Sequence, residues 1–386
     1  MASMKSDVVI IGAGSTGLST AYELAKAGVN VIVVDRNLLA IEAAGRNPGG
    51  IRQIGRDHDE VPLMVAAMRR WHSLSDELKS NLEITEDGYL WVALNARELE
   101  LQRGLAERDA AFGIKEFVYD QSQVRDLAPN ISDFVYGGLY SPTDLIANPF
   151  LVAKAYHANA ERLGARFLFQ TEVIGLQIES GSIRGVVTNK GTISTPLVIN
   201  AAGPWADRIG EMAGLKIPLT PCPNQFILTE PVPKILPPFL LISGIGVCRQ
   251  SARGNIYIGN TNTPGGITGF SKKTNYGEMT RTVTNLLKIV PAFRGVNIIR
   301  TWVGTIDFSP DDNFILSKVD EVQGLILACG FSGHGFALTP IIGQLLSELV
   351  VNGKTSLPVD AFHFNRFKKG LEEKAGHFAH QHMDAV

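Results

Sequence analysis

Three runs of consecutive apolar residues stand out along the chain, at residues 8–11, 31–34 and 325–329. Such short runs without alternation are typical of strands that are buried on both faces of a parallel sheet. Between the first two runs, apolar residues recur at helical spacing from Leu18 to Ala27, and Gly28 is suited to end that helix. The pattern predicts a complete βαβ unit at the start of the chain.

The middle of the chain has a different pattern. A helix rich in acidic and basic residues is predicted near 96–112, and a second helix at 148–164. Three strand-like segments follow at 166–169, 173–179 and 182–188, and turn residues separate them. Consecutive strands with short turns predict a β-meander.

The remaining segments complete the predicted fold. A buried strand at 197–203 ends in small residues, residues 218–300 alternate between apolar and polar positions, and a helix is predicted at 339–351. The alternation favours an antiparallel sheet. We therefore expect an α/β protein with a Rossmann-like dinucleotide-binding domain and an antiparallel-sheet α+β substrate domain, discontinuous in sequence. The expected division is 1–88, 145–217 and 301–386 for the first domain, and 89–144 and 218–300 for the second.

Composition excludes several classes of protein. The chain has 386 residues, a net charge of -2 and 45% hydrophobic residues, which is ordinary for a globular protein of this length. The charge balance gives no basis for nucleic-acid binding. The three cysteines lack metal-ligand spacing and favour a reducing compartment. No apolar run is long enough to span a bilayer, so we expect a cytoplasmic protein without a transmembrane segment.

The first chemical motif is Gly-x-Gly-x-x-Gly at residues 12–17. In such a turn the glycines allow backbone to approach a pyrophosphate, which then lies at a helix N-terminus. Here the motif follows a predicted strand, opens a predicted helix and is followed by Asp35 at the end of the next strand. That context supports dinucleotide binding, with Asp35 on a ribose, over a purely structural turn.

A second glycine-rich loop, residues 330–336 (GFSGHGF), lies between a predicted strand and a predicted helix. Together with residues 300–304 (RTWVG), 309–311 (SPD) and 200–206 (NAAGPWA), this loop resembles the D-amino-acid-oxidase superfamily of flavoproteins. Within this superfamily, the chain is similar to the sarcosine oxidases and to the catalytic subunits of proline dehydrogenases, hydrogen cyanide synthase and opine oxidases. Residues 45–56 (GRNPGGIRQIGR) most resemble the opine oxidase subunits. The resemblance covers nearly the whole chain.

The resemblance implies a flavin cofactor, FAD, and the oxidation of a C–N bond by hydride transfer to flavin N5, which gives an imine. The cofactor supplies this reactivity, and the protein supplies orientation and charge. The residues implied in FAD binding come from all parts of the first domain: Gly12, Gly14, Ser15, Thr16, Gly17, Asp35, Arg36, Gly45, Arg46, Asn47, Gly50, Val173, Ala202, Gly203, Gly304, Gly330, Gly333, His334, Gly335 and Phe336.

The chain departs from its relatives in two ways. Monomeric sarcosine oxidases attach the flavin to a cysteine near the position of Gly304, where this chain has none, so we expect non-covalent FAD. The lysine and arginine that bind substrate carboxylate in relatives are replaced by Ala337 and by Thr305-Ile306. Another cation is therefore needed if the substrate is an amino acid.

Arg52, Arg56 and His334 are the candidate catalytic residues. An arginine binds both oxygens of a carboxylate with its planar fork. Arg52 follows the Gly49-Gly50 turn, so we expect it to hold the substrate, with Arg56 as the second choice. Each has the alternative of a solvated surface arginine. His334 is assigned to the flavin environment, with a backbone-bonded loop histidine as the alternative.

Other interpretations stay open. FAD-dependent oxidation of a hydroxy acid or a polyol phosphate is a second enzymatic possibility, and a flavin-carrying subunit that needs electron-transfer partner chains is a third. The histidines near the C-terminus are interpreted as a solvated tail, and no metal site is predicted: they are His377, His380 and His382.

Overall fold

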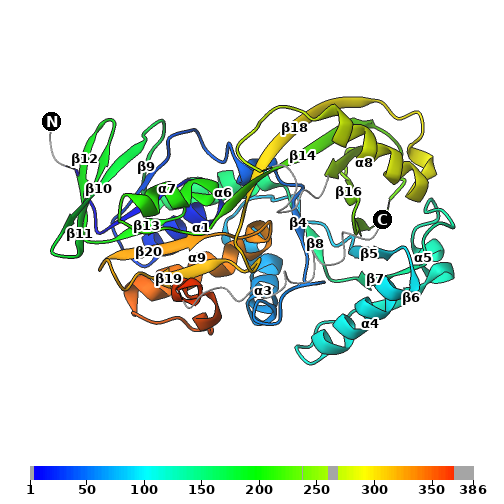
Figure 1. Cartoon of the computed structure of the whole chain (residues 1–386), viewed down its shortest axis with the longest axis horizontal. Coiled ribbons are helices and arrows are strands. Elements are labelled where there is room, and N and C mark those ends of the chain that lie inside the picture. Colours follow the sequence, from blue (N-terminus) through cyan, green and yellow to red (C-terminus); the bar gives the residue numbers. More distant parts are fainter. Residues whose placement is uncertain (1–3, 237, 260–267, 369–386) are drawn as a thin grey trace.

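The computed structural model describes residues 4–236, 238–259 and 268–368, arranged as two packed parts side by side (Figure 1). The predicted histidine tail lies outside the described residues. The helices of the described chain are α1 Ser15–Lys26, α2 Ala43–Arg46, α3 Val61–Glu77, α4 Ala96–Ala110, α5 Gln121–Leu127, α6 Pro149–Arg162, α7 Ala206–Glu211, α8 Tyr276–Ile289 and α9 Gly335–Val351.

The first part is built on a six-stranded sheet with the order β19-β20-β13-β2-β3-β9. Its strands are parallel except for the antiparallel pair β19–β20. They come from the start, middle and end of the chain: β2 Val8–Ile11, β3 Val31–Val34, β9 Arg166–Leu168, β13 Val198–Asn200, β19 Ile315–Lys318 and β20 Leu325–Cys329. The consecutive apolar residues of β2 and β3 are buried because both faces of this sheet are covered.

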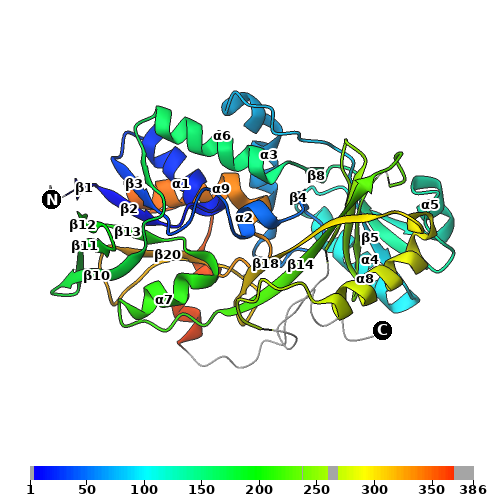
Figure 2. The same cartoon turned by 90° about the horizontal axis from the view of Figure 1, so that it is seen from above.

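Two apolar cores form on the two faces of the sheet. Val8 and Ile10 pack with residues of α1, α3, α6 and α9, whereas Val9 and Ile11 pack with α7 and with a small sheet. Figure 2 shows α1, α6 and α9 on one side and α7 on the other. The small sheet has the order β1-β12-β11-β10, with β1 Met4–Lys5, β10 Val173–Glu179, β11 Ser182–Thr188 and β12 Gly191–Ser194.

The second part is an eight-stranded sheet with the order β18-β14-β17-β16-β15-β5-β7-β6. Most neighbours are antiparallel, but β15 and β5 are parallel. Its strands are β5 Tyr89–Ala93, β6 Phe117–Asp120, β7 Gly137–Ser141, β14 Thr220–Pro231, β15 Phe239–Ile242, β16 Gly246–Gln250, β17 Asn255–Gly259 and β18 Ile298–Phe308. A two-stranded sheet, β4 Gly50–Ile51 with β8 Leu145–Ile146, lies between the two parts (Figure 1).

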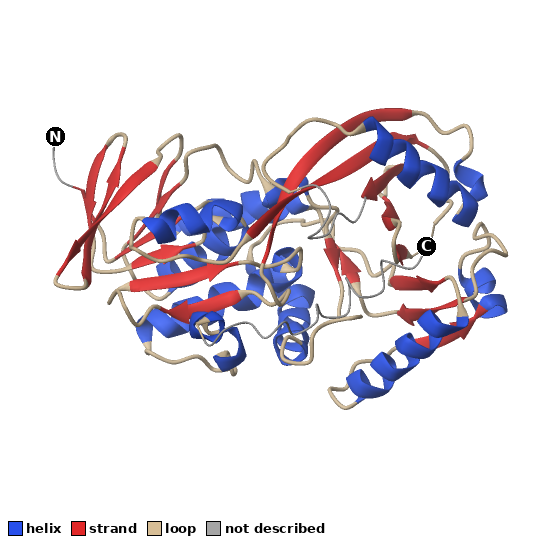
Figure 3. Cartoon of the chain, viewed as in Figure 1, coloured by secondary structure: helices blue, strands red, loops and turns tan. Residues whose placement is uncertain are grey.

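The α/β fold class, with a mostly antiparallel second part, is confirmed, but three details differ from the predictions. β9 pairs with β3, so the meander consists of β10, β11 and β12. Residues 276–289, predicted as sheet, form the helix α8 (Figure 3). This helix buries Thr282, Leu286 and Ile289. Residues 301–308, placed by the sequence in the first domain, belong to β18 and pair with β14.

Candidate active site

A cavity of about 320 Å³ runs through the first part, from the N-terminus of α1 to the loop before α9. Its floor is the turn at Gly12, whose φ of 112° places the backbone against the end of β13. A Cβ at Gly12 would collide with the Ala201 carbonyl, so glycine is required there. At Gly14, by contrast, a Cβ would meet nothing closer than Ala44 Cβ at 4.0 Å. Gly14 therefore leaves open space that faces the cavity.

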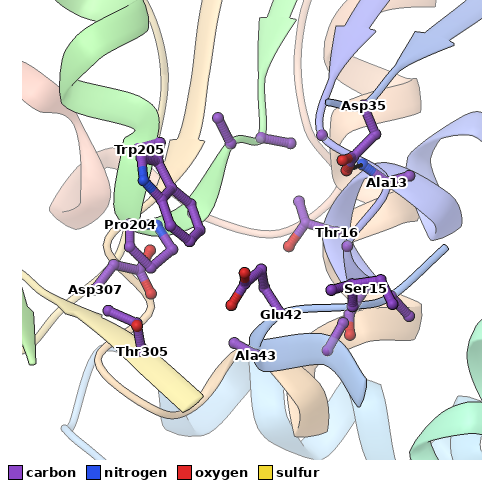
Figure 4. Close-up of a pocket in the computed structure, with 18 of the residues that line it drawn as sticks. Ala13, Ser15, Thr16, Asp35, Glu42, Ala43, Pro204, Trp205, Thr305 and Asp307 are labelled. Atoms are coloured by element: carbon purple, nitrogen blue, oxygen red, sulfur yellow. Dashed lines mark hydrogen bonds between the residues drawn. The ribbon is translucent and has the colours of Figure 1, made fainter. Parts of the chain in front are cut away.

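Asp35 closes one end of the cavity. Its carboxylate accepts the backbone N–H of Ala13 and of Asn37, each at 2.7 Å. Figure 4 shows Asp35 and Ala13 on one side of the cavity, with Trp205 and Pro204 on the other. Burial raises the pKa of Asp35, and the two backbone N–H bonds oppose that rise. The carboxylate thus ties the glycine turn to β3 and is placed at the ribose end of a dinucleotide site.

Aromatic and cationic side chains form the opposite wall. The Arg36 guanidinium lies 4.0 Å from the ring centre of Trp205, and the Phe270 ring stacks on Trp205 with 5.0 Å between the ring centres. Phe270 belongs to residues 268–275, which we call the strap. Lys272 of the strap bonds Glu42 and, at 3.1 Å, the Thr305 hydroxyl. Since Glu42 and Thr305 both line the cavity, the strap is pinned across its wall.

The loop before α9 forms the far end. Gly330 has a φ of 71° and donates its N–H to the Asp307 carboxylate at 2.7 Å. Ser332 donates its N–H to the Asp307 carbonyl at 3.0 Å. Burial raises the pKa of Asp307 to about 6. These bonds fix the loop so that Gly333 and Phe336 line the cavity and the N-terminus of α9 points towards it.

A chain of charged side chains lies beside this loop. Arg56 bonds Glu60 at 2.9 Å, and Glu60 bonds Nδ1 of His334 at 2.9 Å. Nε2 of His334 lies 3.1 Å from Nη2 of Arg52. Burial would raise the pKa of Glu60, but the adjacent His334 and Arg56 outweigh this effect and hold that pKa at about 2. Glu60 is therefore an anion that both neighbours share.

The same contacts define the state of His334. Burial lowers the pKa of His334. Glu60 opposes this effect, whereas the nearby charges of Arg56 and Arg52 lower the pKa of His334 further. A neutral ring that donates Nδ1–H to Glu60 leaves the Nε2 lone pair free to accept from Arg52, which satisfies both contacts. Burial and Arg56 lower the pKa of Arg52 to about 10, so its guanidinium stays charged at neutral pH. Its other contacts are with the carbonyls of Ile54 and Gly55.

The two predicted arginines thus have different environments. The Arg56 side chain is 2% exposed, paired with Glu60 and bonded to the Arg52 carbonyl. Within the described ranges, Arg52 has no carboxylate partner within ion-pair distance. Arg52 is accordingly the better candidate for an external anion.

Most predicted FAD residues come together in the cavity. The lining includes Gly12, Gly14, Ser15, Thr16, Asp35, Arg36, Arg46, Asn47, Val173, Ala202, Gly203, Gly304, Gly333, Gly335 and Phe336. Five others lie behind or beside it: Gly17, Gly45, Gly50, Gly330 and His334. Gly17 and Gly45 allow close packing, since a Cβ at each would collide with the carbonyls of Gly12 and Ala40 respectively.

Sequence reasoning missed several residues of the site. Glu60 could have been found, because Arg56 and Glu60 have the i,i+4 spacing of a helical ion pair. Asn224 lines the cavity, and its buried Oδ1 has no hydrogen-bond partner in the described part of the chain. Arg249 on β16 donates to the carbonyl of Pro48, another lining residue. No local pattern marks Asn224 or Arg249.

Fold and cavity together define a dinucleotide-binding protein. The chain belongs to the FAD dependent oxidoreductase family (DAO), which it matches over residues 7–349. It is therefore an FAD-dependent oxidoreductase, as the motifs predicted.

Individual relatives agree with this family. The chain is 31% identical to hydrogen cyanide synthase subunit HcnC of Pseudomonas protegens, over 94% of this chain and 96% of HcnC. It is 27% identical to human mitochondrial sarcosine dehydrogenase over 95% of its own length, but spans 42% of that protein. The crystal structure of L-proline dehydrogenase from P. horikoshii superposes with a TM-score of 0.91 at 32% identity, covering 96% of this chain and 99% of the other.

The residues present fit FAD. Gly14 and Gly203 leave room for a ligand against the backbone, because a Cβ at either meets no atom closer than 4.0 Å. The unpartnered Asn224 Oδ1 is an acceptor that a bound group with N–H donors satisfies. The α1 N-terminus carries no acidic residue in its first turn, which suits a pyrophosphate.

Proposed function

We propose that this chain uses FAD to oxidise the C–N bond of an amino acid or N-substituted amino acid. The observation that carries the proposal is the Arg52 guanidinium, a charged group without an acidic partner in the described ranges, beside the loop before α9. Buried charges are normally paired, so an anionic substrate is its natural complement. The names of the relatives, which include sarcosine and L-proline dehydrogenases, support an amino-acid substrate.

In this proposal each charged residue has one task. Arg52 binds the substrate carboxylate, and His334 holds the guanidinium from the side through Nε2. Glu60 keeps the proton of His334 on Nδ1 and so keeps Nε2 an acceptor. Arg56 neutralises Glu60, which prevents that carboxylate from competing for Arg52. When bound, FAD accepts a hydride from the carbon next to the nitrogen, and water hydrolyses the resulting imine.

The proposal is tested by anaerobic mixing of the purified protein with amino acids, N-alkyl amino acids and N-carboxyalkyl amino acids, with flavin absorbance as the readout. Hydroxy acids and polyol phosphates are included as the competing alcohol class. Bleaching by amine substrates alone supports the proposal. If only the hydroxy acids or polyol phosphates bleach the flavin, oxidation of an alcohol replaces amine oxidation as the proposed function.

Arg52→Ala tests the anchor. Removing one partner of a desolvated charge pair costs about 2–5 kcal/mol, so flavin reduction by carboxylate substrates should fall roughly thirty-fold or more. Arg52→Lys should recover part of the loss, because lysine lacks the planar fork. Amidated substrates should be unaffected by either change, which separates carboxylate binding from a structural role of Arg52. The exposed Arg69 on α3, changed to Ala, is the control. If Arg52→Ala reduces its flavin at the wild-type rate and with the wild-type half-saturating substrate concentration, another residue binds the substrate carboxylate.

We further propose that the chain works with electron-transfer subunits. HcnC and the sarcosine oxidase beta chain of Rhodobacter capsulatus are named as subunits, and the latter is 28% identical over 94% of this chain. Gel filtration from a native extract tests this, because a lone enzyme elutes at the mass of the chain or its homo-oligomer.

Free thiols at all three cysteines favour a cytoplasmic location. No helix in the described ranges has the length and hydropathy needed to cross a membrane.

A further inference from the structure

A second arginine without an acidic partner in the described part of the chain contacts Pro48, four residues before Arg52 in the sequence. Arg249 is on β16, in the middle of the eight-stranded sheet, and is 8% exposed. Its Nε donates to the Pro48 carbonyl, and its guanidinium lies 4.2 Å from the ring centre of Tyr257. Over residues 4–236, 238–259 and 268–368 no carboxylate lies within ion-pair distance of Arg249.

Such an environment is costly for a cation. Desolvation opposes the charge, and a carbonyl with an aromatic face replaces only part of the lost hydration. Burial accordingly lowers the pKa of Arg249. A guanidinium has five N–H groups, and the Pro48 carbonyl can accept from two of them at most. The guanidinium of Arg249 therefore retains N–H donors for a carboxylate.

Arg249 and Arg52 flank one short piece of backbone. Pro48, which contacts Arg249, precedes Arg52 by four residues, so the Cα atoms of Pro48 and Arg52 are at most about 14 Å apart. Gly50 lies between them, and the Tyr89 hydroxyl lies against Gly50, since a Cβ there would collide with it. Both guanidiniums act electrostatically on this hydroxyl. Pro48 also lines the cavity, so the backbone that Arg249 contacts forms part of the cavity wall.

We propose that the substrate carries two carboxylates, one bound by Arg52 and the other by Arg249, with the amine nitrogen between them. This inference rests on the proposed function and narrows its substrate class to N-carboxyalkyl amino acids. In the reaction, the C–H bond next to the nitrogen breaks, its hydride and the N–H proton pass to FAD, and a C=N bond forms. Water then cleaves that bond to a 2-oxo acid and a primary amino acid.

Binding is tested with compounds that cannot be oxidised at a C–N bond. Thiodiacetate has two carboxylates, (methylthio)acetate has one, and thiodipropionate offers a longer span. Titration into the FAD-loaded protein is followed by the flavin absorbance spectrum. We expect at least one dicarboxylate to bind 30-fold or more tightly than (methylthio)acetate. Equal affinity for one and two carboxylates in the wild-type protein would overturn the inference without any variant.

Arg249→Gln then assigns the second carboxylate. The advantage of the dicarboxylate should shrink to threefold or less, while (methylthio)acetate binds as before; Arg249→Lys should retain part of it. Arg253→Gln, on the turn between β16 and β17, is the matched control, because Arg253 is 85% exposed. FAD content and melting temperature verify that the variants fold. If Arg249→Gln weakens both ligands equally, Arg249 is a sole anchor or a structural residue, and the inference is wrong.

Substrates separate this inference from the proposed function. Iminodiacetate and N-(1-carboxyethyl) amino acids are compared with their monoamides in anaerobic flavin reduction. A 30-fold preference for the diacids supports two anchors. Reduction by amino acids and monoamides with no such preference leaves amine oxidation standing and overturns the dicarboxylate assignment. If no C–N substrate reduces the flavin, the proposed function itself fails.

Discussion

Glu60 is the residue on which the charge balance of the site depends. It is 1% exposed and serves both Arg56 and His334, each at 2.9 Å. Asp144, which is also buried, acts electrostatically on Arg52 together with Glu60. Because Glu60 is already paired with Arg56, the Arg52 guanidinium remains available to an anionic substrate.

Gly14 provides the first prediction at the residue scale. Gly14→Val should abolish FAD binding, because its side chain occupies the space into which the pyrophosphate fits. The fold should survive, since a Cβ at this position is 4.0 Å from the nearest atom. Far-UV circular dichroism and FAD content measure the two effects. Gly104→Ala, in open space on α4, is the control. Full FAD occupancy in Gly14→Val would show that the turn does not hold the pyrophosphate.

Glu116 provides a prediction about pH. Both carboxylate oxygens are buried and unpartnered within the described chain, and burial with nearby Asp109 raises the pKa to about 8. The folded state therefore prefers neutral Glu116, and this stabilisation is lost as pH rises from about 4.5 through about 8. Relative to Glu116→Gln, the wild-type protein should lose up to about 1.4 kcal/mol per pH unit across that range.

Urea unfolding of wild type and Glu116→Gln at several pH values between 5 and 9 measures this difference. Glu107→Gln, an exposed glutamate on the neighbouring α4, is the control. Parallel pH profiles for wild type and Glu116→Gln would mean that Glu116 ionises normally.

At the scale of elements, the strap joins the two parts of the molecule across the FAD cavity. Gly269 donates its N–H to the Pro221 carbonyl at 2.6 Å, and Asn275 donates to the Gln225 side chain at 2.7 Å. Both acceptors are on β14, whereas Lys272 reaches Glu42 at the start of α2. The strap therefore connects the eight-stranded sheet to a wall of the cofactor site.

Lys272→Met should speed FAD release. A partly exposed ion pair contributes about 0.2–1 kcal/mol, so the dissociation rate should rise by roughly 1.4- to fivefold. Flavin fluorescence after dilution into apoprotein-free buffer reports the rate, because free flavin is brighter than protein-bound flavin. Lys273→Met changes the adjacent exposed lysine and serves as the control. Equal release rates in the two variants would assign no retaining role to Lys272.

Elements whose signals are local could be predicted from sequence. Residues 8–35 form strand, turn and helix largely through their own spacing, and Asp35 lies where the pattern placed it. β9 was assigned to the wrong sheet because alternation does not reveal which neighbour a strand pairs with. α8 was missed because it buries only Thr282, Leu286 and Ile289 in a segment otherwise typical of strands.

The site shows the same limit. Arg249 contacts a carbonyl 201 residues away, so only the folded chain brings it to Pro48. The Glu60–His334 contact spans 274 residues. Sequence could identify the cofactor loops, whose glycines act through their own backbone, and could name Arg52 and Arg56 as candidates, but not the long-range contacts of Arg249 and His334.

At the scale of the whole molecule, FAD should be released intact on denaturation. The segment around Gly304 contains no cysteine, and the nearest thiol along the paired strand, Cys222, is buried opposite Ile306. Acid precipitation should leave all flavin in the supernatant, where its absorbance and mass identify it. Flavin that stays with the precipitate would demonstrate a covalent bond. Added FAD should also raise the melting temperature with concentration, since it binds the folded state.

The order of strands in the six-stranded sheet has a consequence for biosynthesis. β13 lies between β2 and β20, which are separated by more than 300 residues of sequence. A ribosome that has translated up to β13 has released the glycine turn and Asp35, but the loop before α9 does not yet exist. Segments distant in sequence can pair only when both have been made. The nascent chain thus holds an open half-site until the loop before α9 has been translated, and cofactor capture follows that step.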